Sequence, residues 1–264
     1  MKNLLNEKNL PILGAVCGDI LGSGYEWHPT KNLNMDLCRK EDTFTDDTVC
    51  TIAVADALLN RKPFDDSLRK WCRKYNYAGY GSAFYRWFSI ENGKPYNSWG
   101  NGSAMRVSAA GSMANSMEEA LDLAKKSAVV THNHPEGIKG AQATAAAIYL
   151  AKTGKSKKEI KEFLQSHFEY DLNRKFKNLQ PSYSFDVSCQ GSVPESIICF
   201  LESEDYEDAI RHAIAMGGDA DTMAAITGTI AAAFYKEIPD KILDHCWMRL
   251  SPDIKEIILS INKK

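Results

Sequence analysis

The stretch Phe44-Thr45-Asp46-Asp47-Thr48 places two adjacent carboxylates between two hydroxyls, directly before the apolar run Val49 to Leu59. Thr45 suits the N-cap position, and acidic residues are favoured in the first turn of a helix. Neighbouring carboxylates also repel each other, so a helix N-terminus, an arginine or a metal ion must offset their charge. The stretch therefore predicts a helix start that either caps itself or forms part of a site.

A second stretch of the same kind, Gly217-Gly218-Asp219-Ala220-Asp221-Thr222, opens the apolar run Met223 to Tyr235. A capping role would stabilise each helix by about 0.3–1 kcal/mol. Both stretches are bounded by apolar sequence, however, and a further carboxylate, Glu26, follows a predicted helix end at Gly22-Ser23-Gly24. We therefore expect five carboxylates to converge near the core: Glu26, Asp46, Asp47, Asp219 and Asp221.

Such a cluster requires cations. Its ligands are all oxygen atoms, with no adjacent cysteine or histidine, which favours Mg²⁺, Mn²⁺ or Ca²⁺ over Zn²⁺. Five negative charges match two divalent ions better than one, and a pair of ions can activate a water and hold substrate oxygens. Because a helix N-terminus repels a cation, free backbone N–H groups there are an alternative site for a phosphate.

The composition of the 264-residue chain is typical of a globular protein, with 25% charged residues and a net charge of −2. This balance gives no electrostatic basis for binding nucleic acid or a membrane surface. The seven cysteines form no Cys-x-x-Cys pair, so we expect reduced core residues. Asn6 to Asn9 interrupt any secretory signal, and the longest apolar run is too short to span a bilayer. We expect a soluble, cytoplasmic protein.

Helical spacing of apolar residues recurs along the chain, and we find no strand alternation and no linker. The predicted helices cover 10–21, 46–60, 65–75, 103–114, 118–130, 136–152, 156–168, 193–202, 206–216, 221–235, 239–250 and 252–261. Residues 28–43 and 172–190 are predicted to be irregular, and 75–102, rich in aromatics and glycines, is a candidate binding loop. The sequence predicts one all-α domain over 1–264, with roughly ten or more helices.

Three weaker signals each have a structural alternative. His132 and His134 form a His-x-His pair that can ligate zinc, or they serve a turn before Pro135. Arg106 is either a phosphate partner or a member of a structural ion pair. The Ser98 to Gly102 loop can bind an anion through backbone N–H groups, although glycine-rich loops are common.

Taken together, these motifs resemble those of the ADP-ribosylglycohydrolases, and they occur in that family's order from residue 12 to about residue 235. The matching stretches are Gly14-Ala-Val-Cys-Gly-Asp-Ile-Leu-Gly22 with Glu26, Phe44 to Thr48, Ser98-Trp-Gly-Asn-Gly-Ser-Ala-Met-Arg-Val107, Thr131-His-Asn-His-Pro135 and Gly217 to Thr222. Two departures stand out: the 79–93 segment lacks the aspartate of arginine-directed relatives, and Trp99 replaces a tyrosine found in some.

The resemblance implies a compact, orthogonal multi-helix domain around a dinuclear site for two Mg²⁺ or Mn²⁺ ions. It implies metal ligation by Thr45, Asp46, Asp47, Asp219, Asp221 and Thr222. Glu26 is expected at the metal centre as a ligand or acid/base group, and Glu26 and Asp47 are the candidates for handling the proton. Substrate binding is expected from Tyr96, Asn97, Ser98, Trp99, Gly100, Asn101, Gly102 and His132.

The implied reaction is hydrolysis of the glycosidic bond at ribose C1″ of an ADP-ribosylated protein or small-molecule conjugate, with release of ADP-ribose. The leaving group stays open among arginine, serine, acetate and a nucleobase. Two alternatives remain at this stage. One is a hydrolase of the same fold acting on another nucleotide or sugar conjugate. The other is a non-catalytic ADP-ribose binder or structural relative.

Overall fold

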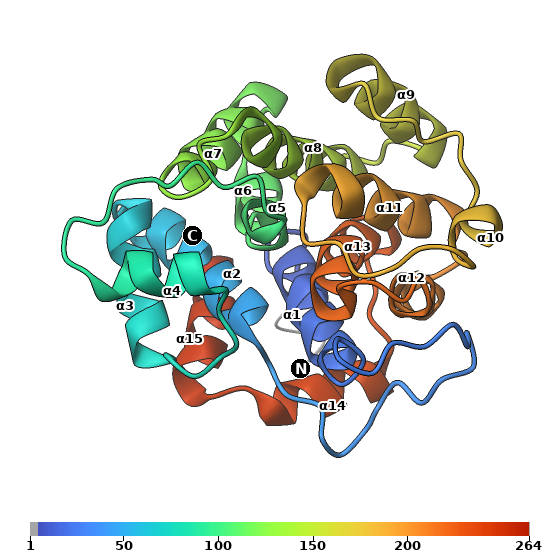
Figure 1. The fold of residues 1–264 in the computed structure, drawn as a ribbon, viewed down its shortest axis with the longest axis horizontal. Helices are drawn as coiled ribbons and strands as arrows, with labels where there is room; N and C mark the ends of the chain where they lie inside the picture. Colours follow the sequence, from blue (N-terminus) through green and yellow to red (C-terminus); the bar gives the residue numbers. More distant parts are fainter. Residues whose placement is uncertain (1–4, 264) are drawn as a thin grey trace.

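The computed structural model describes residues 5–263, and this range contains fifteen α-helices and no β-strand (Figure 1). The predicted all-α class and single domain are confirmed. In chain order the helices are α1 (Leu10–Ser23), α2 (Asp46–Asn60), α3 (Phe64–Lys74), α4 (Ser82–Ser89), α5 (Gly102–Met105), α6 (Ser108–Met113), α7 (Met117–Val129), α8 (Pro135–Lys152), α9 (Lys157–Phe168), α10 (Phe176–Leu179), α11 (Cys189–Glu202), α12 (Tyr206–Ala215), α13 (Ala220–Tyr235), α14 (Asp240–Arg249) and α15 (Pro252–Ser260). One turn of 3-10 helix follows at Ile261–Lys263.

Helices α1 and α13 form the central pair of the fold (Figure 1). Glycines at every fourth position of α1 allow unusually close contact: a Cβ added to Gly18 would lie 2.1 Å from a carbonyl oxygen of α13. Gly14 faces Ala232 near the end of α13, whereas Gly22 faces Asp221 in its first turn. The two helices therefore run antiparallel, and the end of α1 lies beside the start of α13.

The remaining helices surround this pair. Helices α8, α11 and α12 pack on α13, while α2 packs on α1, α3 and α15. Most buried apolar side chains belong to one cluster that reaches from Leu10 to Ile261, and a smaller one lies between α6, α7 and α8. Many of these buried residues are alanines, which let helix backbones approach closely. All seven cysteines are free, and only Cys38 is partly exposed.

The structure corrects the sequence prediction in three places. The aromatic 75–102 segment contains a helix, α4, whose buried face consists of Phe84, Trp87 and Phe88. The flanking glycines obscured this helical periodicity in the sequence. The helix predicted over 103–114 is two short helices separated at Arg106, whose buried side chain bonds to the end of α7. Helix α11 starts at Cys189, earlier than predicted, because Ser188 caps it, and α10 forms one turn within the segment predicted to be irregular.

Candidate active site

The start of α2 is held by a carboxylate from another helix. Asp19 of α1 is fully buried and accepts hydrogen bonds from the backbone N–H groups of Thr45 (2.9 Å) and Thr48 (3.0 Å). Both threonine hydroxyls also donate to it, that of Thr45 at 2.7 Å. The capping expected from the sequence is also present: Thr45 is the N-cap of α2, and its hydroxyl accepts from the Asp47 N–H at 3.3 Å. Thr45 and Asp19 thus satisfy these first-turn donors, and the Asp46 and Asp47 side chains line the cavity.

The start of α13 is organised differently. Asp219 accepts a hydrogen bond from the Asn101 side-chain amide at 2.8 Å, and Asp221 Oδ1 accepts from the Thr222 N–H at 2.9 Å. Glu26, just past the end of α1, meets this helix start because α1 and α13 pack closely and antiparallel. Glu26, Asp219 and Asp221 each offer one carboxylate oxygen, and these three atoms lie within 4.8 Å of one another.

The two helix starts open onto one cavity of about 420 Å³. Of the predicted site residues, those that line it are Glu26, Asp46, Asp47, Tyr96, Ser98, Gly100, Asn101, Gly102, His132, Asp219, Asp221 and Thr222. The predicted residues Thr45, Asn97 and Trp99 are not part of the lining. A second cavity of about 410 Å³ near Leu10 and Ile238 has no comparable group of three potential metal ligands within residues 5–263.

Burial and mutual repulsion make this carboxylate cluster costly to ionise. Burial, followed by the charges of Asp221 and Asp19, raises the pKa of Glu26 to about 7. Burial raises the pKa of Asp219 to about 6, although the Asn101 hydrogen bond opposes the rise. Burial and neighbouring acids hold the pKa values of Asp46, Asp47 and Asp221 well above their ordinary range.

One carboxylate oxygen of the cluster is also unpaired. Asp47 Oδ2 is buried and has no hydrogen-bond partner among the described residues. A buried polar atom without a partner is unfavourable unless a ligand satisfies it. The arrangement offers two chemical possibilities: several hard oxygen ligands for divalent cations, and carboxyl groups that can exchange a proton near neutral pH.

The Ser98 to Gly102 loop forms another part of the cavity wall. The Asn101 N–H donates to the Val187 carbonyl at 2.8 Å, which ties this loop to the segment before α11. Gly100 and Gly102 pack over His132: a Cβ on Gly102 would lie 3.2 Å from His132 Nε2. The loop therefore rests directly on the imidazole.

The two histidines of the His-x-His motif have separate positions. His134 is the N-cap of α8 and its Nδ1 accepts from the Glu136 N–H at 3.1 Å, which matches the turn role considered from sequence. His132 lies in the cavity wall, and the structure groups neither histidine with other potential metal ligands in the described range. Arg106 forms no ion pair with a described carboxylate, so the structural ion pair considered above is absent within residues 5–263.

Several site residues had no role in the sequence prediction. One of them is Asp19. It is the only carboxylate in the otherwise apolar helix α1, and this feature could have marked it as a candidate. Trp27 and Phe185 are others: their rings stack at the cavity rim, 5.7 Å apart, and Trp27 is 72% exposed. Their proximity depends on two loops far apart in the chain, and no local pattern indicates it.

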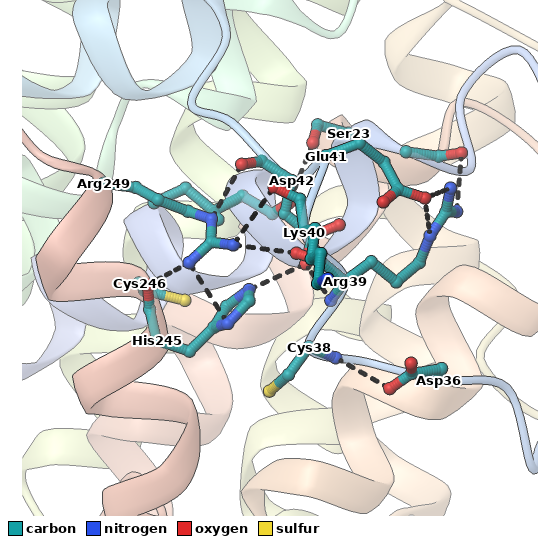
Figure 2. A network of polar contacts seen from close by, with 12 residues as sticks. Ser23, Asp36, Cys38, Arg39, Lys40, Glu41, Asp42, His245, Cys246 and Arg249 are labelled. Atoms are coloured by element: carbon teal, nitrogen blue, oxygen red, sulfur yellow. Dashed lines mark hydrogen bonds and ion pairs between the residues drawn. The ribbon is translucent and has the colours of Figure 1, made fainter.

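The loop that leads from Glu26 to α2 is braced against α14 (Figure 2). Arg39 donates to the Gly24 carbonyl at 3.0 Å, and its guanidinium lies 4.7 Å from the centre of the Tyr25 ring. Asp42 in turn accepts from the Arg39 N–H and from His245 Nε2, both at 2.8 Å, while Arg249 donates to the Asp42 carbonyl at 2.7 Å. This polar network, Arg39–Asp42–His245–Arg249, fixes the turn that carries Glu26.

The fold and the site define an all-helical protein with an acidic cavity built where two helix N-termini meet. The sequence model of the ADP-ribosylglycohydrolase family matches residues 11–262, and the chain therefore belongs to this family.

Curated relatives include the ADP-ribosylhydrolase ARH3 of Homo sapiens, 27% identical over 89% of this chain and 87% of that protein. The ARH3 of Mus musculus is 26% identical over 89% and 86%. An uncharacterized protein of Archaeoglobus fulgidus is 28% identical over 88% and 89%. A solved structure described as an ADP-ribosylglycohydrolase-related protein complex has a TM-score of 0.79 and covers 100% of this chain and 99% of its own, at 22% identity. This last likeness establishes the fold alone. Within the described residues, no helix has the length and apolar character needed to span a membrane.

Proposed function

We propose that the protein is a metal-dependent hydrolase that cleaves the glycosidic bond at ribose C1″ of ADP-ribosylated substrates and releases ADP-ribose. The observation that carries the proposal is the meeting of the α2 and α13 starts, where carboxylates from both helices line one cavity. Membership of the ADP-ribosylglycohydrolase family supports the same reaction class. The substrates under this proposal are ADP-ribosylated proteins or small-molecule ADP-ribose conjugates.

The side chains of the cavity fit divalent cations. All candidate ligands are hard oxygens, Asp47 Oδ2 lacks a partner, and neighbouring acids raise each other's pKa. We propose that two Mg²⁺ or Mn²⁺ ions are held by Asp46, Asp47, Asp219, Asp221 and Thr222, with Glu26 beside them. Thr45, also expected from the resemblance, lies outside the lining, and its hydroxyl donates to Asp19. When bound, such ions neutralise the carboxylates and hold ribose hydroxyls and a water.

The chain's own residues supply the remaining chemistry. Glu26, beside the proposed ions, is the first candidate for moving a proton at the reacting centre, and Asp47 is the second. The surrounding carboxylates stabilise the oxocarbenium-like charge that develops at the anomeric carbon. The lining residues of the 96–102 loop and His132 bind the diphosphate and adenosine part of the substrate.

The leaving group is expected beyond Asp46, where Gly79, Gly81, Ser82 and Ala83 line the cavity. These residues are small and uncharged. All four are exposed, and Asp46 is the nearby carboxylate, with its Oδ1 3.6 Å from a Cβ added to Gly79. We infer a neutral leaving group, such as a hydroxyl side chain or an ester, over arginine from the aspartate that the 79–93 segment lacks relative to arginine-directed relatives.

The test is release of free ADP-ribose from a panel of serine-linked, arginine-linked and O-acetyl-linked conjugates, with purified protein and Mg²⁺. We expect the serine-linked or O-acetyl conjugate to be cleaved faster than the arginine conjugate. Asp46→Asn and Asp221→Asn should each abolish turnover, whereas Asp244→Asn, which changes an exposed carboxylate on α14, should not. Full activity in both site variants would contradict the assignment. An inert panel together with tight ADP-ribose binding would indicate a non-catalytic binder instead.

A further inference from the structure

Arg106 is a buried cation beside the cavity. Its side chain is 1% exposed, and its Nη2 donates to the Ser127 carbonyl at 2.7 Å and to Thr131 Oγ1 at 2.9 Å. A guanidinium can only donate hydrogen bonds. The direction of the Arg106–Thr131 bond is therefore fixed, and Thr131 Oγ1 accepts in it.

Thr131 passes this directionality on to His132. Its hydroxyl is fully buried, and its second neighbour is His132 Nδ1 at 2.7 Å. If Nδ1 carried a proton and donated to Thr131, the buried hydroxyl hydrogen would have no acceptor among the described residues, which is unfavourable. The favoured arrangement has the Thr131 hydroxyl donating to an unprotonated Nδ1.

The imidazole is also held neutral. His132 is 5% exposed, and its burial and the positive charge of Arg106 keep its pKa well below the ordinary value. A neutral imidazole that accepts at Nδ1 carries its proton at Nε2. This nitrogen lies against Gly100 and Gly102 of the cavity wall and has no hydrogen-bond partner among the described residues. The Nε2–H is thus an available donor at the cavity.

We propose that Arg106 and Thr131 are positioning residues that set the tautomer of His132, so that its Nε2–H donates to an oxygen of the bound substrate. A donor-only group at this point selects an acceptor such as a phosphate or ribose oxygen. The identity of the substrate rests on the proposed function, whereas the tautomer follows from the hydrogen bonds alone.

The tautomer can be measured without any activity assay. In protein with ¹⁵N-labelled histidine, two-bond ¹H–¹⁵N correlations distinguish protonated from unprotonated ring nitrogens, and His132→Asn assigns the signals. We expect a protonated Nε2 and an unprotonated Nδ1 for His132. A protonated Nδ1, or a doubly protonated ring at neutral pH, would overturn the proposal. The tautomer itself is read from the unmodified chain, and His132→Asn serves only to assign its signals.

Variants test the hydrogen-bond relay that runs from Arg106 through Thr131 to His132. Thr131→Val keeps the shape of the side chain but removes the hydroxyl, so we expect His132 to lose its single tautomer. The Kd for ADP-ribose measured by calorimetry should rise about tenfold, which corresponds to the loss of one hydrogen bond. Thr131→Ser should restore both properties. The matched control is Thr144→Val on α8, because that buried hydroxyl has no hydrogen-bond partner among the described residues. An unchanged tautomer in Thr131→Val would contradict the relay.

The background variant His132→Ala separates positioning from packing. Adding Thr131→Val to His132→Ala should weaken ADP-ribose binding no further if Thr131 acts through the imidazole. An additional tenfold loss would show that Thr131 acts otherwise, and the proposal would fail. If ADP-ribose does not bind the unmodified protein at all, the proposed function fails while the tautomer result still decides the relay.

Discussion

The two acidic helix starts of this protein look alike in sequence but are built in different ways. At the start of α2, the buried Asp19 accepts hydrogen bonds from both flanking threonines and their backbone N–H groups. At the start of α13, no carboxylate from another helix within residues 5–263 accepts from the first turn, and Asp219 is held by the Asn101 amide and by a side-chain hydrogen bond with Asp221. The first start is organised by hydrogen bonding, the second mainly by the close packing of α1 against α13.

The site has two halves, the α2 start and the α13 start, and each should be destabilised by a different substitution. The α2 half should depend on one buried carboxylate, because that group satisfies several donors at once. The α13 half should depend on glycines of α1, because they set the distance between Asp221 and Glu26. Changes at Gly18 and Asp19, neighbours in sequence, should therefore damage different halves.

The largest effect is expected for Gly18→Ala. The new Cβ would lie 2.1 Å from a backbone carbonyl oxygen of α13, and a backbone atom cannot move aside as a flexible side chain can. Overpacking typically costs about 1–3 kcal/mol, and we expect the upper end or more in urea unfolding. Gly81→Ala is the control, since nothing lies within 4 Å of its added Cβ. If Gly18→Ala is as stable as the unmodified chain, the close-packing account of the α13 half is wrong.

Asp19→Asn should have the next largest effect. The amide keeps one acceptor oxygen but turns the other into a donor, which then faces the donors of Thr45 or Thr48. We expect a loss of about 1–3 kcal/mol in the free energy of unfolding. Asn101→Ser, which releases only Asp219, should cost less. Equal losses in the two variants would remove the contrast between the helix starts.

In the presence of a chelator, the stability of the fold should depend on pH, because the carboxylates of both helix starts share one cavity. The folded-state pKa values of Glu26 (about 7) and Asp219 (about 6) are raised, so the metal-free fold binds protons that the unfolded chain releases. Their contribution to stability is fully present below about pH 4 and is lost as the pH rises through 6 and 7. In chelator, we expect Tm to fall between about pH 5 and about pH 8.

Mg²⁺ binds the ionised carboxylates, so its stabilising effect on Tm should grow over the same pH window. The control is the double variant Glu26→Gln with Asp219→Asn, in which the fall of Tm in chelator should be smaller. A Tm in chelator that is higher at pH 8 than at pH 5 would contradict this charge balance.

How much of this site the sequence reveals depends on how local the signal is. The start of α2 follows from N-capping by Thr45 and from apolar periodicity, and the start of α13 follows from apolar periodicity. The convergence of Asp46, Asp47, Asp219 and Asp221 follows from their shared character. The role of Asp19 does not, because its partners lie 26 or more positions away. Helix α4 escaped prediction for another reason: its short apolar face is flanked by glycines, which dilute the periodicity.

The smallest effect is expected for Arg39→Ala in the polar network that holds the Glu26 turn (Figure 2). Loss of its bond to the Gly24 carbonyl should lower kcat about threefold to tenfold, the value of one hydrogen bond. The same substitution in a Glu26→Gln background should lower kcat no further, because Arg39 acts by positioning Glu26. Additive losses would assign Arg39 a general structural role.

The central claim is that the two helix starts share bound cations. Anomalous diffraction from crystals soaked with Mn²⁺ tests it most directly, because it locates the ions without reference to turnover. The account predicts two Mn²⁺ peaks in the cavity, contacted by carboxylates of both the α2 start (Asp46, Asp47) and the α13 start (Asp219, Asp221). No peak there, or ions contacted by only one of the two helix starts, would contradict it.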